Sequence, residues 1–153
     1  MKKFFFAVFL LVFSLSAFSQ EKKLAAGFGL EWNMDSRHNF AGGVLFNFDY
    51  SLPKNSAIGF TIEGSNNFYG ISVIEPILFF RTYFPEFDHS GFFAQVNVGG
   101  FIILENNEVT VLPLMGCEGG YRKLLGSSFY IEPFGRLGYP FAWGIGLVAG
   151  MRF

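Results

Sequence analysis

The chain has 153 residues, a formal net charge of −1, 51% apolar residues and only 15% charged residues. Its 20% aromatic content and low charge exclude an intrinsically disordered chain, and its single cysteine excludes a scaffold held by disulfides. The near-neutral charge offers no basic footprint for DNA or RNA, so no nucleic-acid partner is expected.

The N-terminal segment has the features of a secretory signal peptide. Two lysines precede an apolar run from Phe4 to Phe13, and small residues follow up to Ser19. The apolar run is shorter than the roughly 20 residues that a spanning helix needs. We therefore expect cleavage after Ser19, which makes residues 1–19 the signal peptide and residues 20–153 a single β-barrel domain.

Beyond this segment, apolar residues recur with period two, which is typical of β-strands. In the last strand Trp143, Ile145 and Leu147 alternate with glycines. In an outer-membrane barrel the bulky face meets lipid, and the small or polar face fills a narrow lumen. In chain order the expected strands are Leu24–Trp32, Ala41–Leu52, Ala57–Ser65, Ile71–Phe84, Phe92–Leu104, Val109–Leu124, Phe129–Tyr139 and Ala142–Phe153.

These strands predict the fold class. They are all-β, even in number, and near the length of about 9–11 residues that a tilted membrane strand needs. We expect an eight-stranded antiparallel up-and-down transmembrane β-barrel, preceded by a cleavable signal peptide. Pro76, Pro113 and Pro133 fall inside expected strands, and because proline lacks an N–H we expect each to mark a bulge or a kink at a strand end.

The expected strand faces place most of the charged residues inside the barrel. Charges in a narrow interior are costly unless paired, and an eight-stranded barrel has room for side chains but not for an aqueous channel. We therefore expect a closed, salt-bridged lumen; the alternative is a narrow gated pore with a lining of mixed sign. The expected lumen charges are Glu31, Asp49, Glu63, Glu75, Arg81, Glu118, Arg122, Glu132, Arg136 and Arg152.

The charge pattern also predicts a register. A three-residue turn at residues 126–128 would place Leu125 opposite Phe129. The same register sets Arg122 opposite Glu132 and Glu118 opposite Arg136, so two ion pairs would form together. Arg152 is expected to join Arg122 and Glu132 in a cluster near the periplasmic end.

Aromatic side chains on the outer face are expected to form two belts at the lipid boundaries, where one end of the ring is apolar and the other is wet. The outer belt would contain Trp32, Phe40, Tyr139 and Trp143. The periplasmic belt would contain Tyr50, Phe84, Tyr121, Phe129 and Phe153.

The chain resembles the small eight-stranded outer-membrane β-barrels of the OmpA-transmembrane-domain and OmpX type. The resemblance covers residues 20–153 and rests on the export signal, the eight alternating strands and the C-terminal strand. It implies that Phe153, Met151 and Leu147 form the signal read by the outer-membrane barrel assembly machinery. It further implies a monomer in the bacterial outer membrane, exported through the periplasm and surrounded by outer-membrane lipid.

Signals for catalysis are weak. His38 lies near Asp35 and Ser36, and barrel-borne acyl-transfer enzymes use histidine with serine. All three residues fall in one short connection, whereas catalytic partners normally converge from different elements. The spacing of the two histidines and the one cysteine fits no metal site, and no cofactor is expected.

We therefore expect a structural or surface-presenting role and no enzyme activity. Three alternatives stay open: a narrow gated pore, a lipid-modifying enzyme of the outer membrane, and a soluble periplasmic barrel that binds an apolar ligand. The soluble barrel would have bulky residues inside and charges outside, the reverse of the expected facing.

Overall fold

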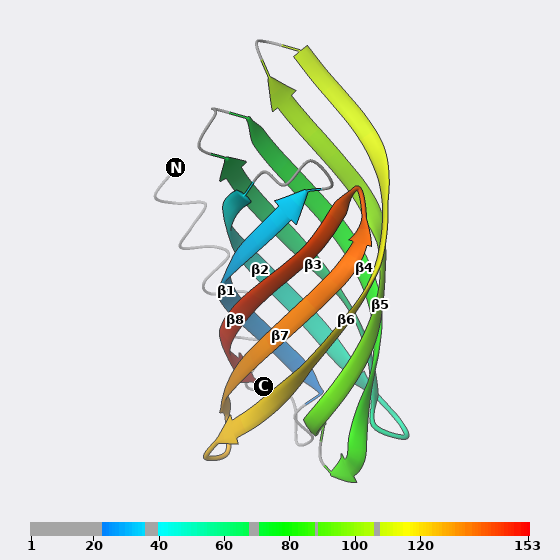
Figure 1. Ribbon diagram of the computed structural model, residues 1–153. Helices are drawn as coiled ribbons and strands as arrows, with labels where there is room; N and C mark the ends of the chain where they lie inside the picture. Colours follow the sequence, from blue (N-terminus) through cyan, green and yellow to red (C-terminus); the bar gives the residue numbers. More distant parts are fainter. Residues whose placement is uncertain (1–22, 36–39, 68–70, 88, 106–107) are drawn as a thin grey trace, which may run out of the picture.

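A computed structural model describes residues 23–35, 40–67, 71–87, 89–105 and 108–153, so the expected signal peptide lies outside the described residues. Eight antiparallel strands follow one another around a closed barrel, and the last pairs with the first (Figure 1). This is the fold class expected from the alternation. The strands are β1 (Leu24–Asp35), β2 (Phe40–Leu52), β3 (Ser56–Asn67), β4 (Ser72–Phe87), β5 (Ser90–Glu105), β6 (Glu108–Leu125), β7 (Phe129–Tyr139) and β8 (Phe141–Arg152).

Among the described residues, no helix is both long enough and apolar enough to cross a membrane.

The faces of the strands are those expected from the sequence. Large apolar side chains stand on the outer surface; Leu78, for example, is 63% exposed and Leu30 is 55% exposed. Charged side chains are buried in the lumen, where Arg81 and Glu75 are each 1% exposed. Because successive side chains of a strand point to opposite faces, this distribution follows from the period-two pattern on all eight strands.

The expected register of β6 and β7 is confirmed. Leu125 pairs with Phe129 across the turn at residues 126–128, and Glu118 pairs with Arg136 further along. The turn opens on Gly126, whose φ of 74° lies in the left-handed region that glycine adopts without a steric penalty.

The expectation of bulges at the three prolines is wrong. Pro76 pairs with Ile62, Pro113 with Gly100, and Pro133 with Leu147, with no shift of register at any of them. On the other side of Pro76 and Pro133 the pairing stops for two residues and resumes in the same register. All three rings are exposed on the outer face. A single missing N–H removes one ladder hydrogen bond while the neighbouring bonds keep the strands aligned, so the ladder tolerates the prolines without a bulge.

Strands β1 to β6 are all longer than expected. β1 continues to Asp35, β3 to Asn67 and β4 to Phe87, while β5 begins at Ser90 and β6 at Glu108. The β6–β7 pairing starts at Met115 opposite Tyr139, so the first part of β6 pairs with β5 and not with β7. The β5–β6 hairpin therefore projects beyond the rest of the barrel, as Figure 1 shows in yellow and green.

The interior also contains an apolar core. Tyr83, Phe93, Tyr130 and Phe134 pack together in the half of the lumen near the turn at residues 126–128. A second, smaller group lies nearer the projecting hairpin and consists of Ile77, Leu114 and Phe141, with Phe101 packed against it. The lumen is thus filled by aromatic rings as well as by charged groups.

Candidate functional site

All ten expected lumen charges lie inside the barrel. Nine of the residues are less than 6% exposed, and the side chain of Glu118 is 11% exposed. Ion pairs join nine of these residues into two clusters. We call them the double-arginine cluster, consisting of Asp49, Arg81, Glu118, Arg122 and Glu132, and the single-arginine cluster, consisting of Glu31, Glu63, Glu75 and Arg136.

Glu132 is the centre of the double-arginine cluster. Its Oε2 accepts from Nε of Arg122 at 2.5 Å and from Nη1 of Arg81 at 2.8 Å. Nη2 of Arg122 contacts Oδ2 of Asp49 at 2.8 Å, and Nη2 of Arg81 lies 3.6 Å from Oε1 of Glu118. The cluster therefore joins strands β2, β4, β6 and β7 across the lumen.

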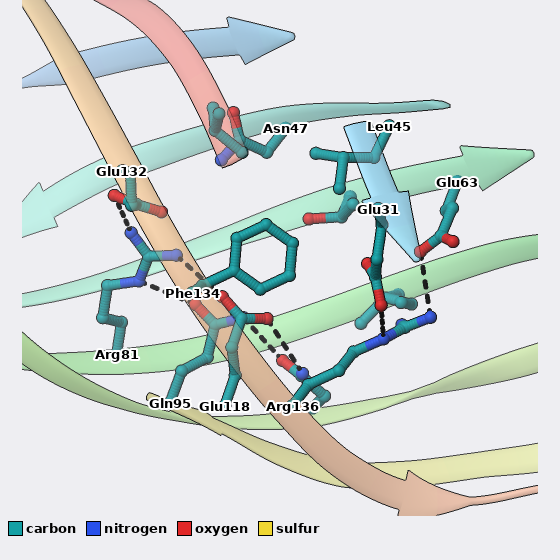
Figure 2. A pocket seen from close by; sticks show the side chains of 14 residues that line it. Glu31, Leu45, Asn47, Glu63, Arg81, Gln95, Glu118, Glu132, Phe134 and Arg136 are labelled. Atoms are coloured by element: carbon teal, nitrogen blue, oxygen red, sulfur yellow. Dashed lines mark hydrogen bonds and ion pairs between the residues drawn. The ribbon is translucent and has the colours of Figure 1, made fainter. Parts of the chain in front are cut away.

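Arg136 is the centre of the single-arginine cluster. Its guanidinium contacts Glu31 through Nε and Glu63 through Nη2 at 3.0 Å (Figure 2). It also contacts Glu75 through Nη1 at 2.9 Å. Nη2 also donates to Oδ1 of Asn33 at 3.1 Å, and Asn33 donates to Glu63 at 2.7 Å. One guanidinium from β7 thus serves three carboxyl groups from β1, β3 and β4.

The sequence identified the charged residues but not all of their partners. Arg122 and Glu132 are in contact as expected. The second arginine on Glu132 is Arg81 from β4, where Arg152 was expected; Arg152 is 5% exposed and pairs with Ala25 of β1. Arg136 lies opposite Glu118 in register, but its ion pairs cross the lumen to three other strands.

Aromatic rings also contact the three arginines of the two clusters. These contacts were not expected from the sequence. The guanidinium carbon of Arg81 lies 4.0 Å from the ring centre of Phe93, that of Arg122 lies 4.1 Å from Tyr130, and that of Arg136 lies 4.0 Å from Phe141. These distances suit cation–π attraction, which strengthens when the cation is desolvated. The parity that places Arg81 and Gln95 inside also places Tyr83 and Phe93 inside, so the alternation contained the signal.

Little free space remains between the two clusters. A cavity of about 20 Å³ lies among Glu31, Glu63, Arg81, Glu132 and Arg136, with Phe134 beside it (Figure 2). That volume is close to what one water molecule needs. An arrangement of this kind cross-links the strands and blocks the lumen.

The expected interface aromatics stand on the outer face. Trp32, Phe40 and Tyr139 are exposed near the strand ends that border the projecting hairpin, and Trp143 packs edge to face against Phe40 at 6.3 Å. The residues Tyr50, Phe84, Tyr121 and Phe129 are exposed near the opposite ends of their strands.

The expected assembly signal lies on and just after β8. Leu147 and Met151 are exposed on the outer face. Phe153 follows the end of the strand, and its backbone N–H donates to the carbonyl of Leu24 at 2.7 Å.

The structure does not test the catalytic candidate in the connection after β1. Ser36 and His38 lie outside the described residues. His89 is half-buried: its Nε2 lies 3.0 Å from the Leu52 carbonyl oxygen, and its ring packs against Tyr83 at 5.9 Å. His89 therefore joins two turns at one end of the barrel. In the described part of the chain, no group of three His, Cys, Asp or Glu side chains is arranged to hold a metal ion.

Comparison with known proteins gives matches by structure alone. No protein-family model matches the chain, and no curated protein matches its sequence. Its fold is similar to the crystal structure of Neisserial surface protein A, with a TM-score of 0.60, 10% identity, and coverage of 84% of this chain and 94% of that one.

Two further solved structures are similar. The N-terminal β-barrel domain of Pseudomonas aeruginosa OprF gives a TM-score of 0.54 at 11% identity, covering 84% of this chain and 97% of that one. A de novo designed transmembrane β-barrel gives 0.53 at 12% identity, covering 86% of this chain and 98% of that one. These identities are too low to carry function, but they agree on architecture. The chain has the fold of the small eight-stranded outer-membrane β-barrels.

Proposed function

We propose that the chain is an integral protein of the bacterial outer membrane, with a closed lumen and a structural or surface-presenting role. It neither conducts large solutes nor modifies lipid. The observation that carries the proposal is the distribution of side chains, which is the reverse of that in a soluble protein. Apolar groups stand on the outer surface, and ion pairs fill the lumen.

The outer surface supports a lipid environment. Soluble monomers rarely expose contiguous apolar patches larger than a few hundred Å². Here every strand presents large apolar side chains outward, and Phe28, Phe46 and Phe92 are all about half exposed or more. Lipid would cover this surface and remove its contact with water.

The lumen supports a non-conducting role. The cavity between the two clusters has a volume of about 20 Å³, and six of the ten lumen charges line it. Opening a path would break several desolvated ion pairs at once, and each broken pair leaves an uncompensated charge.

The location is tested by expressing the full chain in a Gram-negative host and fractionating the membranes. We expect the protein in the outer-membrane fraction, with faster gel migration before boiling than after it, since a folded barrel remains compact in detergent. Recovery of the protein in the soluble periplasmic fraction would overturn the proposal in favour of a soluble barrel.

The absence of transport and catalysis is tested with purified, folded protein. We expect no conductance of porin size in a planar bilayer and no release of fatty acid from outer-membrane lipid. A lipid-modifying activity that disappears in Ser36→Ala or His38→Ala would overturn the non-catalytic role. Porin-sized conductance would overturn the closed lumen.

A further inference from the structure

A second cavity opens at the end of the barrel from which the β5–β6 hairpin projects. Its volume is about 380 Å³, within the range of sites that hold small molecules. It lies above the single-arginine cluster, because Asn33 and Glu75 line the cavity and both contact Arg136.

The walls of this cavity are mainly apolar, and Asn33, Ser65 and Asn67 add neutral polar groups. Phe101 and Ile103 from β5 and Leu112 from β6 face it from the projecting hairpin, and Phe141 from β8 lines it as well. Phe101, Ile103 and Leu112 have the parity of the lumen face, so lipid would not cover them. Phe141 has the parity of the outer face of β8, but it lies beside the register shift between Met34 and Asp35 and is only 3% exposed. Leu114, which is 1% exposed, packs with Phe141 and Phe101 next to this cavity.

The charged groups at the cavity all have the same sign. Glu75 lines the cavity at 1% exposure, and Glu105 lines it as an exposed residue of β5. None of the residues that line it in the described part of the chain is a lysine, an arginine or a histidine. Beneath it, Glu75 shares Arg136 with Glu31 and Glu63, so three carboxyl groups face one guanidinium.

We infer that this cavity binds a small amphipathic organic cation. The apolar body of the ligand packs against Phe101, Ile103 and Leu112. Its ammonium group lies toward Glu75, where it supplies positive charge to a cluster in which carboxyl groups outnumber guanidinium groups. The inference goes beyond the proposed structural role, because it assigns a ligand to the exposed mouth of a barrel whose lumen stays closed.

The chemistry favours a cation over a neutral or anionic ligand of the same shape. A buried carboxylate interacts most strongly with a charged donor, since charge-assisted hydrogen bonds are roughly twice as strong as neutral ones. An anion would meet only like charge at Glu75 and Glu105. The apolar walls then contribute most of the affinity, and the carboxyl groups determine the selectivity for cations.

The test uses the full barrel in nanodiscs of zwitterionic lipid, which carry no net charge to attract the probes. Three probes share one body: phenethylamine as the cation, phenethyl alcohol as the neutral analogue and hydrocinnamate as the anion. Methyl NMR of labelled Ile, Leu and Val separates binding at the site from partitioning into lipid, because Ile103 and Leu112 report on the cavity. We expect phenethylamine to shift these signals saturably and to bind at least about tenfold more tightly than the alcohol.

Three variants test the geometry. Leu112→Trp places a larger ring in the cavity and should weaken the shifts at Ile103. Val111→Trp adds the same bulk one residue away on the outer face, where Val111 is 64% exposed, and should leave binding unchanged. Glu75→Gln should weaken the amine at least about tenfold and leave the alcohol nearly unaffected.

The outcomes that overturn the inference are distinct from those that overturn the proposed function. Equal affinity for the amine and the alcohol, with no effect of Glu75→Gln, would show that the cavity does not select cations. No shift with any probe at millimolar concentration, in protein that keeps its heat-dependent gel migration, would remove the ligand site altogether. Neither result bears on the membrane location or on the closed lumen.

Discussion

Glu132 holds the double-arginine cluster together, because one carboxylate oxygen contacts both Arg81 and Arg122. Removing it leaves two buried guanidinium groups without their shared partner. Breaking a buried pair in this way costs about 3–5 kcal/mol. Glu108 is a suitable reference, since it is exposed at the start of β6 and surface substitutions usually change stability by less than about 0.5 kcal/mol.

We therefore predict that Glu132→Ala lowers the free energy of unfolding by about 3–5 kcal/mol and that Glu108→Ala leaves it nearly unchanged. The measurement is reversible denaturant unfolding in lipid vesicles. Glu132→Gln serves as a further control, because it keeps the shape and an acceptor oxygen and should fall between the two. Equal unfolding midpoints for Glu132→Ala and Glu108→Ala would contradict the role of the cluster.

Gly146 tests the close packing of the lumen. A Cβ atom at this position would lie 2.4 Å from Cζ of Phe134 and 2.7 Å from the carbonyl oxygen of Leu30. A Cβ at Gly64, on the outer face, would meet no atom within 4 Å. We predict that Gly146→Val destabilises the barrel by about 1–3 kcal/mol through overpacking, while Gly64→Val does not. Unfolding of both variants by the same denaturant series checks this; similar losses would mean that the lumen can relax around a larger side chain.

At the level of elements, the β6–β7 hairpin depends on its turn. Gly126 has a φ of 74°, and an alanine there would place its Cβ too close to the following carbonyl oxygen. We predict that Gly126→Ala costs about 1 kcal/mol and that Gly126→Asn costs less, because asparagine adopts this conformation more readily. Thermal unfolding of the two variants side by side decides it, and a larger loss for asparagine than for alanine would contradict the turn geometry.

The prolines show where reasoning from a single element fails. A proline inside a strand argues for a bulge when the strand is considered alone. In the barrel the residue pairs before and after each proline hold the strands in register. Pro113 lies in the part of β6 that pairs with β5 alone, opposite Gly100, which has no side chain to crowd the ring, so the loss of one N–H is absorbed without a shift.

For the whole molecule, the boundary of the membrane gives the sharpest test. Val96 lies near the middle of β5, paired with Phe80 of β4 and Cys117 of β6. Val109 lies near the tip of the projecting hairpin. Both are exposed on the outer face, at 57% and 64%. If lipid surrounds the wall and the hairpin extends beyond it, the same charge has different costs at the two positions.

We predict that Val96→Lys destabilises the folded barrel in vesicles by about 2–4 kcal/mol, whereas Val109→Lys costs about 0–1 kcal/mol. The difference should shrink in detergent, which adapts its apolar thickness to the protein. Equal costs in vesicles would mean that the bilayer covers the hairpin as fully as the wall, or that no bilayer surrounds the barrel.

The sequence by itself determined the eight strands, their two faces and the register of β6 against β7. Period-two alternation assigns each side chain to the lumen or to the outer face, and a short turn leaves few possible pairings, so these features depend on neighbours along the chain. The sequence also predicted the contact between Arg122 and Glu132 on neighbouring strands, but only the tertiary structure decided which charges meet across the lumen. Arg136 reaches Glu31, Glu63 and Glu75, and Glu132 receives Arg81, because closure brings β7 across the lumen from β1, β3 and β4. A long guanidinium side chain can span a narrow barrel, so its partners depend on the relative heights of non-adjacent strands around the closed wall, which no local pattern specifies.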